Sequence, residues 1–230
     1  MKSEEIKKEI RAIFGKKWNT RVGRQVPEAE DIALGNDAVT LSGTVLYADM
    51  ADSTGLVNGY RPWFAAEVYK AYLLGACRVI RNHGGEVTAF DGDRVMAVFL
   101  GNVKNTTAVK AALQINYLVA KTNEMLREAY PTTAYTLRQT IGVDTSDLFV
   151  AKTGIRNAND LVWVGRAANY AAKLSALGSE GFPTYITNDV FTKLNKEAKF
   201  GGQDNRLMWE KRTWTAHQIM VHRSNWHWEI

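Results

Sequence analysis

Residues 86–99 read EVTAFDGDRVMAVF, two apolar and β-branched runs on either side of Asp91-Gly92-Asp93. An Asp-Gly pair between two such runs is typical of a β-hairpin with a tight turn. The sequence therefore predicts two strands, 86–90 and 94–99, joined by an acidic tip.

Upstream of this hairpin, residues 44–49 (TVLYAD) predict a strand that ends in a carboxylate, Asp49. A long helix is expected from Pro62 to Gly84, because proline favours the first turn of a helix and glycine its end. Residues 3–14 place Ile6, Ile10, Ile13 and Phe14 on one helical stripe. Downstream, we predict a helix over 108–126, a strand pair over 137–143 and 148–152, a helix over 166–177, and a small strand and helix over 184–194.

This order of elements predicts an α+β fold, a ferredoxin-like β-α-β-β-α-β sheet with helices on one face. We divide the chain into an N-terminal helical arm and linker, residues 1–38, and a main domain with C-terminal strands, residues 39–230. Four of the seven tryptophans lie in the last 22 residues. They indicate terminal strands packed on the sheet, with a self-association surface as the alternative.

The composition bounds the class of protein. The chain has 230 residues, 46% of them hydrophobic, a net charge of +5 and a single cysteine, Cys77. One cysteine forms no disulfide framework and fits a reducing compartment. The charged N-terminus lacks a signal-peptide core, and no stretch is long and apolar enough to cross a bilayer. We therefore expect a cytoplasmic protein without a membrane partner. The sequence has no run of Lys and Arg of the kind that binds nucleic acid, so we expect no nucleic-acid partner.

Asp49 and Asp93 would lie side by side if the hairpin pairs with the strand over 44–49. Two carboxylates at such a short distance repel each other unless a cation lies between them. Oxygen ligands with open positions favour Mg²⁺ or Mn²⁺, and a pair of such ions indicates phosphoryl transfer. The loop over 51–55, with Ala51, Ser53 and Thr54, has the size to contact a phosphate through its backbone amides. The structural alternative is that Asp49 caps a helix and Asp93 closes a turn.

Residues 164–174 (VGRAANYAAKL) carry a further candidate pair, Asn169 and Lys173. Four residues apart, they share one face of the predicted helix. An amide and a cation there could contact a ribose and a phosphoryl group, although a solvated polar stripe would show the same spacing.

Taken together, these motifs resemble the class III nucleotidyl cyclases. The resemblance rests on three motifs that follow one another in the family's order within residues 40–190. They are the segment 47–54 (YADMADST), the segments 84–86 and 92–99, and Gly165 with Asn169 and Lys173. It implies a head-to-tail homodimer with sites at its interface. Asp49 and Asp93 of one protomer, with the backbone carbonyl of Met50, would hold two Mn²⁺ or Mg²⁺ ions.

The same resemblance implies that Asn169 and Lys173 come from the other protomer and act on the ribose and the α-phosphate. The ribose 3′-hydroxyl would then attack the α-phosphate of a nucleoside triphosphate and release pyrophosphate. Lys173 stands where the family usually has arginine. Lysine keeps the positive charge but cannot form the paired hydrogen bonds of a guanidinium group.

The sequence departs from purine cyclases at the two positions that read the base, which are Ala89 and Val162 here. Neither side chain forms hydrogen bonds, and Phe90 and Trp163 beside them are bulky enough to narrow the pocket. In this the chain resembles the stand-alone pyrimidine cyclases of bacterial anti-phage (Pycsar) defence. That similarity implies UTP or CTP as substrate, and cyclic UMP or cyclic CMP as a second messenger for a separate effector.

Two alternatives remain at this point: an adenylate cyclase with unusual base contacts, and a catalytically silent nucleotide-binding homologue. Retention of Asp49, Asp93 and Asn169 together favours an active enzyme. A diguanylate-type synthase fits less well, because Gly84-Gly85 precedes the first hairpin strand and does not form its turn.

Overall fold

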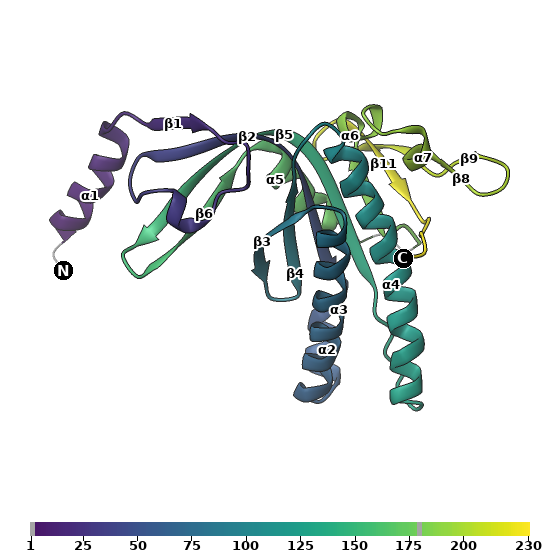
Figure 1. The fold of residues 1–230 in the computed structure, drawn as a ribbon. Helices are drawn as coiled ribbons and strands as arrows, with labels where there is room; N and C mark the ends of the chain where they lie inside the picture. The colour runs from purple at the N-terminus through teal and green to yellow at the C-terminus, as the bar shows by residue number, and fades with distance from the viewer. Residues whose placement is uncertain (1–2, 179–180) are drawn as a thin grey trace.

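The computed structural model describes residues 3–178 and 181–230 (Figure 1). Its helices are α1 (Ser3–Gly15), α2 (Ser53–Gly59), α3 (Pro62–Asn82), α4 (Lys104–Ala129), α5 (Arg166–Ser175), α6 (Asn188–Thr192) and α7 (Lys196–Lys199), with a 3₁₀ turn at Ala29–Asp31. Its strands are β1 (Asn19–Val22), β2 (Asp37–Met50), β3 (Glu86–Asp91), β4 (Arg94–Phe99), β5 (Gln139–Ile155), β6 (Ala158–Val164), β7 (Thr184–Thr187), β8 (Phe200–Gly201), β9 (Arg206–Leu207), β10 (Glu210–Trp214) and β11 (Ile219–Ser224).

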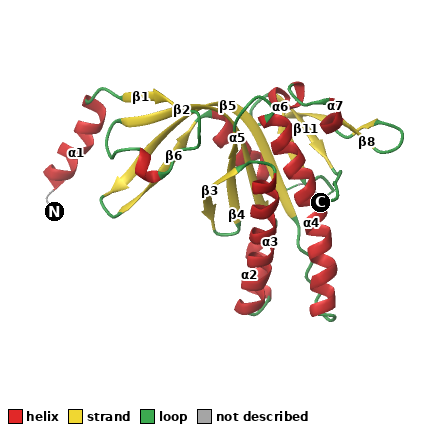
Figure 2. Cartoon of the chain, viewed as in Figure 1, coloured by secondary structure: helices red, strands yellow, loops and turns green. Residues whose placement is uncertain are grey.

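One mixed sheet organises the chain, with the strand order β10-β11-β7-β5-β2-β4-β3. β1 pairs with β2, β6 pairs with β5, and β8 and β9 form a small sheet of their own. The order β2-α3-β3-β4-α4-β5 confirms the predicted α+β class (Figure 2). The long strands β2 and β5 pair antiparallel from Ala38–Ala151 to Met50–Gln139 and form the centre of the sheet.

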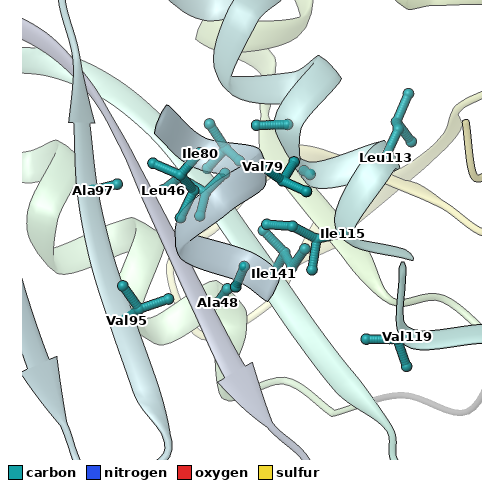
Figure 3. Packing of buried hydrophobic residues seen from close by; sticks show 14 of the residues in the cluster. Leu46, Ala48, Val79, Ile80, Val95, Ala97, Leu113, Ile115, Val119 and Ile141 are labelled. Atoms are coloured by element: carbon teal, nitrogen blue, oxygen red, sulfur yellow. The ribbon is translucent and has the colours of Figure 1, made fainter. Parts of the chain in front are cut away.

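Helices cover both faces of this sheet, not one face as predicted. Alternate residues of β2 divide between two cores, because successive side chains of a strand point to opposite faces. Leu46 and Ala48 pack with α3 and α4 (Figure 3), whereas Val45 packs with Ala167 and Ala171 of α5. The buried side of α5 consists mainly of alanines, whose small apolar surface gives too weak a signal to predict which face of the sheet the helix covers.

β5 is one continuous strand where the sequence predicted a pair, 137–143 and 148–152. The polar residues 144–147 suggested a turn, yet they pair in register with residues 42–45 of β2. Asp144 is fully buried there and accepts hydrogen bonds from Arg166 and Thr187. The true hairpin partner is β6, and Asn157 in the turn between them has a φ of 68°. A left-handed residue is typical of such a tight turn.

The first turn of α4 also lies outside the predicted range, which began at residue 108. Asn105 and Thr106 are buried polar residues, so they carry no apolar periodicity. The carbonyl oxygen of the Asn105 side chain accepts from Thr44, and the Thr106 hydroxyl accepts from the Asn195 backbone. Contacts to distant segments therefore stabilise this helix start.

The N-terminal arm is helical as predicted, and none of the residues of α1 is buried. Figure 1 shows it projecting from the edge of the sheet. The stretch after it is not wholly irregular, because β1 pairs in parallel with residues 37–40 of β2.

The C-terminal tryptophans pack on the domain, as the first of the two interpretations predicted. Trp209 and Trp214 are buried, and Trp226 and Trp228 are half-buried against the main core. The Trp209 indole donates to the Ala198 carbonyl at 2.7 Å. β10 and β11 extend the sheet beyond β7.

Candidate active site

The end of β2 and the tip of the β3–β4 hairpin bring Asp49 and Asp93 together. β2 pairs antiparallel with β4, and Asp49 lies directly opposite Arg94. Asp93 precedes Arg94 in the turn, so both carboxylates lie at the same rim of the sheet. This is the juxtaposition that the sequence predicted on the condition that the hairpin pairs with this strand.

The rim carries more negative than positive charge. Arg94 Nε lies 3.5 Å from Asp49 Oδ1 and its guanidinium lies 3.7 Å from Asp91. The Asp49 side chain is 17% exposed. Burial, together with the charges of Asp93 and Asp91, raises its pKa to about 6 against the opposing effect of Arg94. One arginine therefore faces three carboxylates, which leaves room for further positive charge.

Asp93 provides the observation that best fits a bound cation. Its Oδ2 atom is buried and has no hydrogen-bond partner within the described residues. A buried carboxylate oxygen without a donor is costly unless a cation or water satisfies it. Residues 3–178 and 181–230 contain no cluster of three or more His, Cys, Asp or Glu side chains that could hold a metal. Two carboxylates suit Mg²⁺ or Mn²⁺, which keep water and phosphate oxygens in their remaining positions.

The segment after Met50 differs from the sequence expectation. The Met50 side chain is buried in the core, so only its backbone could contact an ion. The predicted phosphate loop is largely the first turn of α2, which starts at Ser53 and includes Thr54, whereas Ala51 is still in the connection from β2. The Asp52 carboxylate caps this helix by accepting from the Gly55 amide at 3.2 Å. Asp52, not Asp49, is therefore the helix cap, which leaves the Asp49 carboxylate free of that structural role.

α5 presents Asn169 and Lys173 to solvent on one face, while its other face is buried on the sheet. Neither side chain has a hydrogen-bond or ion-pair partner in the part of the chain that the structure describes. The close packing of this helix on the sheet depends on Gly142 of β5, because a Cβ atom there would lie 2.1 Å from the Ala171 carbonyl oxygen. The glycine therefore determines how deeply α5, with its polar pair, packs on the sheet.

An ion pair at the start of α5 was missed by sequence reasoning. Arg166 Nε lies 3.1 Å from Asp144 Oδ2, and the guanidinium also contacts Asp189. The hydroxyl of Ser146 accepts from the Ala167 backbone amide at 2.9 Å. Nothing local in the sequence signals these contacts, because their partners lie 21 to 23 residues apart.

The four predicted base-pocket residues lie on two strands, β3 and β6. Phe90 is 60% exposed and Val162 is 38% exposed, while Ala89 and Trp163 are half-buried against the core beneath α5. A cavity of about 530 Å³ lies between these strands and residues 24–29. Trp163 lines this cavity, but Ala89, Phe90 and Val162 do not. The structure therefore brings one of the four into a preformed cavity and leaves two at the surface.

Comparison with known proteins identifies the family to which this chain belongs. A protein named uridylate cyclase from Xanthomonas perforans is 50% identical over 221 residues, which cover 95% of this chain and 94% of that protein. Uridylate cyclases from Burkholderia cepacia and Rhodovulum sp. (strain MB263) are 44% and 35% identical and cover at least 96% of both chains compared. The chain belongs to this family of nucleotide cyclases. The name of the family agrees with the resemblance to pyrimidine cyclases in the sequence.

Solved structures of class III cyclases share the fold of this cyclase. The guanylyl cyclase Cya2 superposes with a TM-score of 0.68 at 16% identity, over 83% of this chain and 94% of that one. The adenylyl cyclase CyaB from Pseudomonas aeruginosa superposes with a TM-score of 0.68 at 17% identity, over 81% of this chain and 95% of that one.

No family model matches the sequence of this cyclase. None of its helices within 3–178 and 181–230 has the length and apolar character needed to span a membrane.

Proposed function

We propose that this nucleotide cyclase converts UTP into 3′,5′-cyclic UMP and pyrophosphate, with CTP as the alternative pyrimidine substrate. Three relatives named uridylate cyclase, 35–50% identical over nearly the whole chain, are the observation that carries the choice of base. Ala89 and Val162 agree with it, because neither side chain can satisfy a polar purine edge. Each unpaired group there would cost about 1–3 kcal/mol.

The metal-binding role falls to Asp49, Asp93 and the backbone carbonyl of Met50. The charge excess at this rim and the unpartnered Asp93 Oδ2 support this assignment. Two bound Mn²⁺ or Mg²⁺ ions would make the ribose 3′-hydroxyl more acidic and would neutralise charge on the pyrophosphate. Ser53 and Thr54 lie at the start of α2 next to this rim, where their backbone amides could contact the triphosphate.

The second half of each site would come from another protomer in a homodimer. Asn169 and Lys173 are exposed and unpartnered within the described residues, which suits groups that act across an interface. Exposed apolar side chains on β3 and β6, Phe90, Val162 and Val164, support a covered surface near them. Asn169 would orient the ribose by hydrogen bonding, and Lys173 would contact the α-phosphate.

The reaction forms one bond and breaks one. The ribose 3′-oxygen bonds to the α-phosphorus, the bond from that phosphorus to the bridging α–β oxygen breaks, and pyrophosphate leaves. The proton of the 3′-hydroxyl passes to solvent. Lys173 would stabilise the charge that develops on the α-phosphoryl oxygens, where a positioned cation is most effective.

The product would act as a second messenger in bacterial anti-phage defence, read by a separate effector protein. This part of the proposal rests on the resemblance to the Pycsar cyclases. Cyclic UMP should accumulate in cells that carry the wild-type gene after phage challenge and should not accumulate with Asp49→Ala. Equal cyclic UMP levels before and after challenge would argue against this role.

The test of the activity is incubation of the purified protein with equal UTP, CTP, ATP and GTP plus Mn²⁺, followed by chromatography. We expect cyclic UMP, or cyclic CMP, well ahead of the purine products, with about 10- to 200-fold discrimination from each base contact. Asp49→Ala and Asp93→Ala are the controls and should lower the rate about a thousand-fold while keeping the fold. Cyclic AMP or cyclic GMP as the main product would refute the pyrimidine assignment, and wild-type rates in either variant would refute the metal assignment.

A further inference from the structure

Tyr72 has a buried hydroxyl group that the fold itself does not use. The residue lies in the middle of α3, is 1% exposed and belongs to the main core. Its hydroxyl makes no hydrogen bond within the described residues. An unpaired buried hydroxyl costs about 1–3 kcal/mol, and phenylalanine would fill the same space without that cost. Packing therefore explains the ring but not the oxygen.

The hydroxyl lies within electrostatic range of the acidic rim. Burial raises the pKa of Tyr72 well above 10, and the charges of Asp49 and Asp93 raise it further. The group is therefore a hydrogen-bond donor at any physiological pH. It is a donor without an acceptor, and Asp93, whose charge acts on it, has in Oδ2 an acceptor without a donor.

The pairing of the two carboxylates favours Asp93 over Asp49 as the acceptor. Val95 and Ala97 of β4 face α3 in the main core (Figure 3). Asp93 lies in the turn immediately before this strand, and its Oδ2 atom is buried without a partner within the described residues. Asp49 instead lies opposite Arg94 and is paired with it.

We propose that Tyr72 is a positioning residue that donates a hydrogen bond to the Asp93 carboxylate, directly or through one buried water, when that carboxylate holds a cation. The inference rests on the proposed metal site and adds a partner behind it. One carboxylate oxygen would face the ion and the other would be held by the tyrosine from the core side. Hydrogen-bond partners of metal ligands orient the ligand, and removing one typically weakens metal binding about 10- to 100-fold.

The test is the Mn²⁺ affinity of the purified protein without nucleotide, measured by calorimetry or by EPR of free Mn²⁺. Tyr72→Phe should raise the Kd about 10-fold or more, while its melting temperature in EDTA stays at or above the wild-type value because the unpaired hydroxyl is gone. Tyr135→Phe is the matched control. It removes another buried hydroxyl without a partner, one that Asp49 and Asp93 do not influence, and should leave the Mn²⁺ affinity unchanged.

A double-mutant comparison assigns the effect to Asp93. In an Asp93→Asn background, adding Tyr72→Phe should change the remaining Mn²⁺ affinity less than two-fold. A Tyr72→Phe protein that melts normally and binds Mn²⁺ as the wild type does would overturn the inference while the metal site stands. Wild-type protein that binds Mn²⁺ no better than Asp93→Ala would overturn both.

Discussion

Asp49 is a carboxylic acid that the fold holds in an environment unfavourable to its charge. Its pKa is raised to about 6, first by burial and then by Asp93 and Asp91, although Arg94 lies 3.5 Å away. A cation at the rim would reverse this balance, because it favours the ionised form. The metal-free protein therefore carries a local penalty that a bound ion would remove.

This penalty predicts an unusual pH dependence for the metal-free protein. Well below pH 3.8 the Asp49 carboxyl is protonated in both the folded and the unfolded states and costs nothing. As the pH rises to about 6, the unfolded chain releases this proton first, so the free energy of unfolding falls, and the loss is complete above pH 6. Asp49→Asn should therefore raise the free energy of unfolding at pH 7.5 by up to about 3 kcal/mol.

Urea denaturation in EDTA checks this prediction. The same two proteins at pH 3.5 provide the control, because the gain from Asp49→Asn should disappear there. Saturating Mn²⁺ at pH 7.5 should stabilise the wild type and not the variant. Equal stability of the two metal-free proteins at pH 7.5 would contradict the assigned penalty.

At the scale of the element, α5 illustrates how one glycine positions the helix that carries Asn169 and Lys173. A Cβ atom on Gly142 would lie 2.1 Å from the Ala171 carbonyl oxygen and 2.7 Å from the Ser175 nitrogen, both in the backbone of α5. Backbone atoms cannot rotate away as a side chain can. Any larger residue at this position must push the helix off the sheet, together with Asn169 and Lys173.

Gly142→Ala should therefore reduce both stability and turnover. Overpacking of this kind costs about 1–3 kcal/mol, and a shift of about 1 Å in positioning groups can lower kcat about 100-fold. Thermal melts and the rate at saturating substrate measure the two effects. Gly59→Ala is the control, because a Cβ atom at the end of α2 would meet nothing within 4 Å. If Gly142→Ala lowers the melting temperature but leaves kcat unchanged, the close packing of α5 on the sheet does not position Asn169 and Lys173 for the reaction.

At the scale of the whole molecule, the two halves of the proposed site come from separate elements of one chain. Asp49 and Asp93 lie at the rim where β2 meets the β3–β4 hairpin, and Asn169 and Lys173 lie on the solvent side of α5. A symmetric dimer would place each half opposite the other twice. Activity then depends on which combination of chains forms each interface.

Mixing two inactive variants tests this arrangement. Asp49→Ala and Asn169→Ala proteins should each be inactive and should regain activity after subunit exchange. In the heterodimer one site carries both lesions and the other carries neither, so about a quarter of all sites in an equilibrated mixture are intact. Co-purification of differently tagged chains verifies exchange. No recovery of product despite verified exchange would place the whole site within one chain.

The sequence alone predicted the parts of the fold that local chemistry specifies. The Asp-Gly turn and the alternation around it indicate the β3–β4 hairpin, and proline and glycine mark the ends of α3. Because these signals lie within a few residues of the elements they control, the acidic tip of the hairpin could be predicted, whereas its place beside Asp49 depends on the pairing of β4 with β2. The spacing of Asn169 and Lys173 likewise determines that they share a face of α5.

The tertiary structure decided what depends on contacts between distant segments. Asp144 is compatible with a continuous β5 only because Arg166 and Thr187 satisfy its buried charge, and neither partner is adjacent in sequence. The distance between α5 and the sheet depends on the close approach to Gly142. Tyr72 follows an ordinary apolar periodicity, and only the packing of α3 beneath the hairpin brings its hydroxyl near the acidic rim. Helical and strand periodicity specifies which residues share a face, but the free energy of burial and polar satisfaction selects what that face meets.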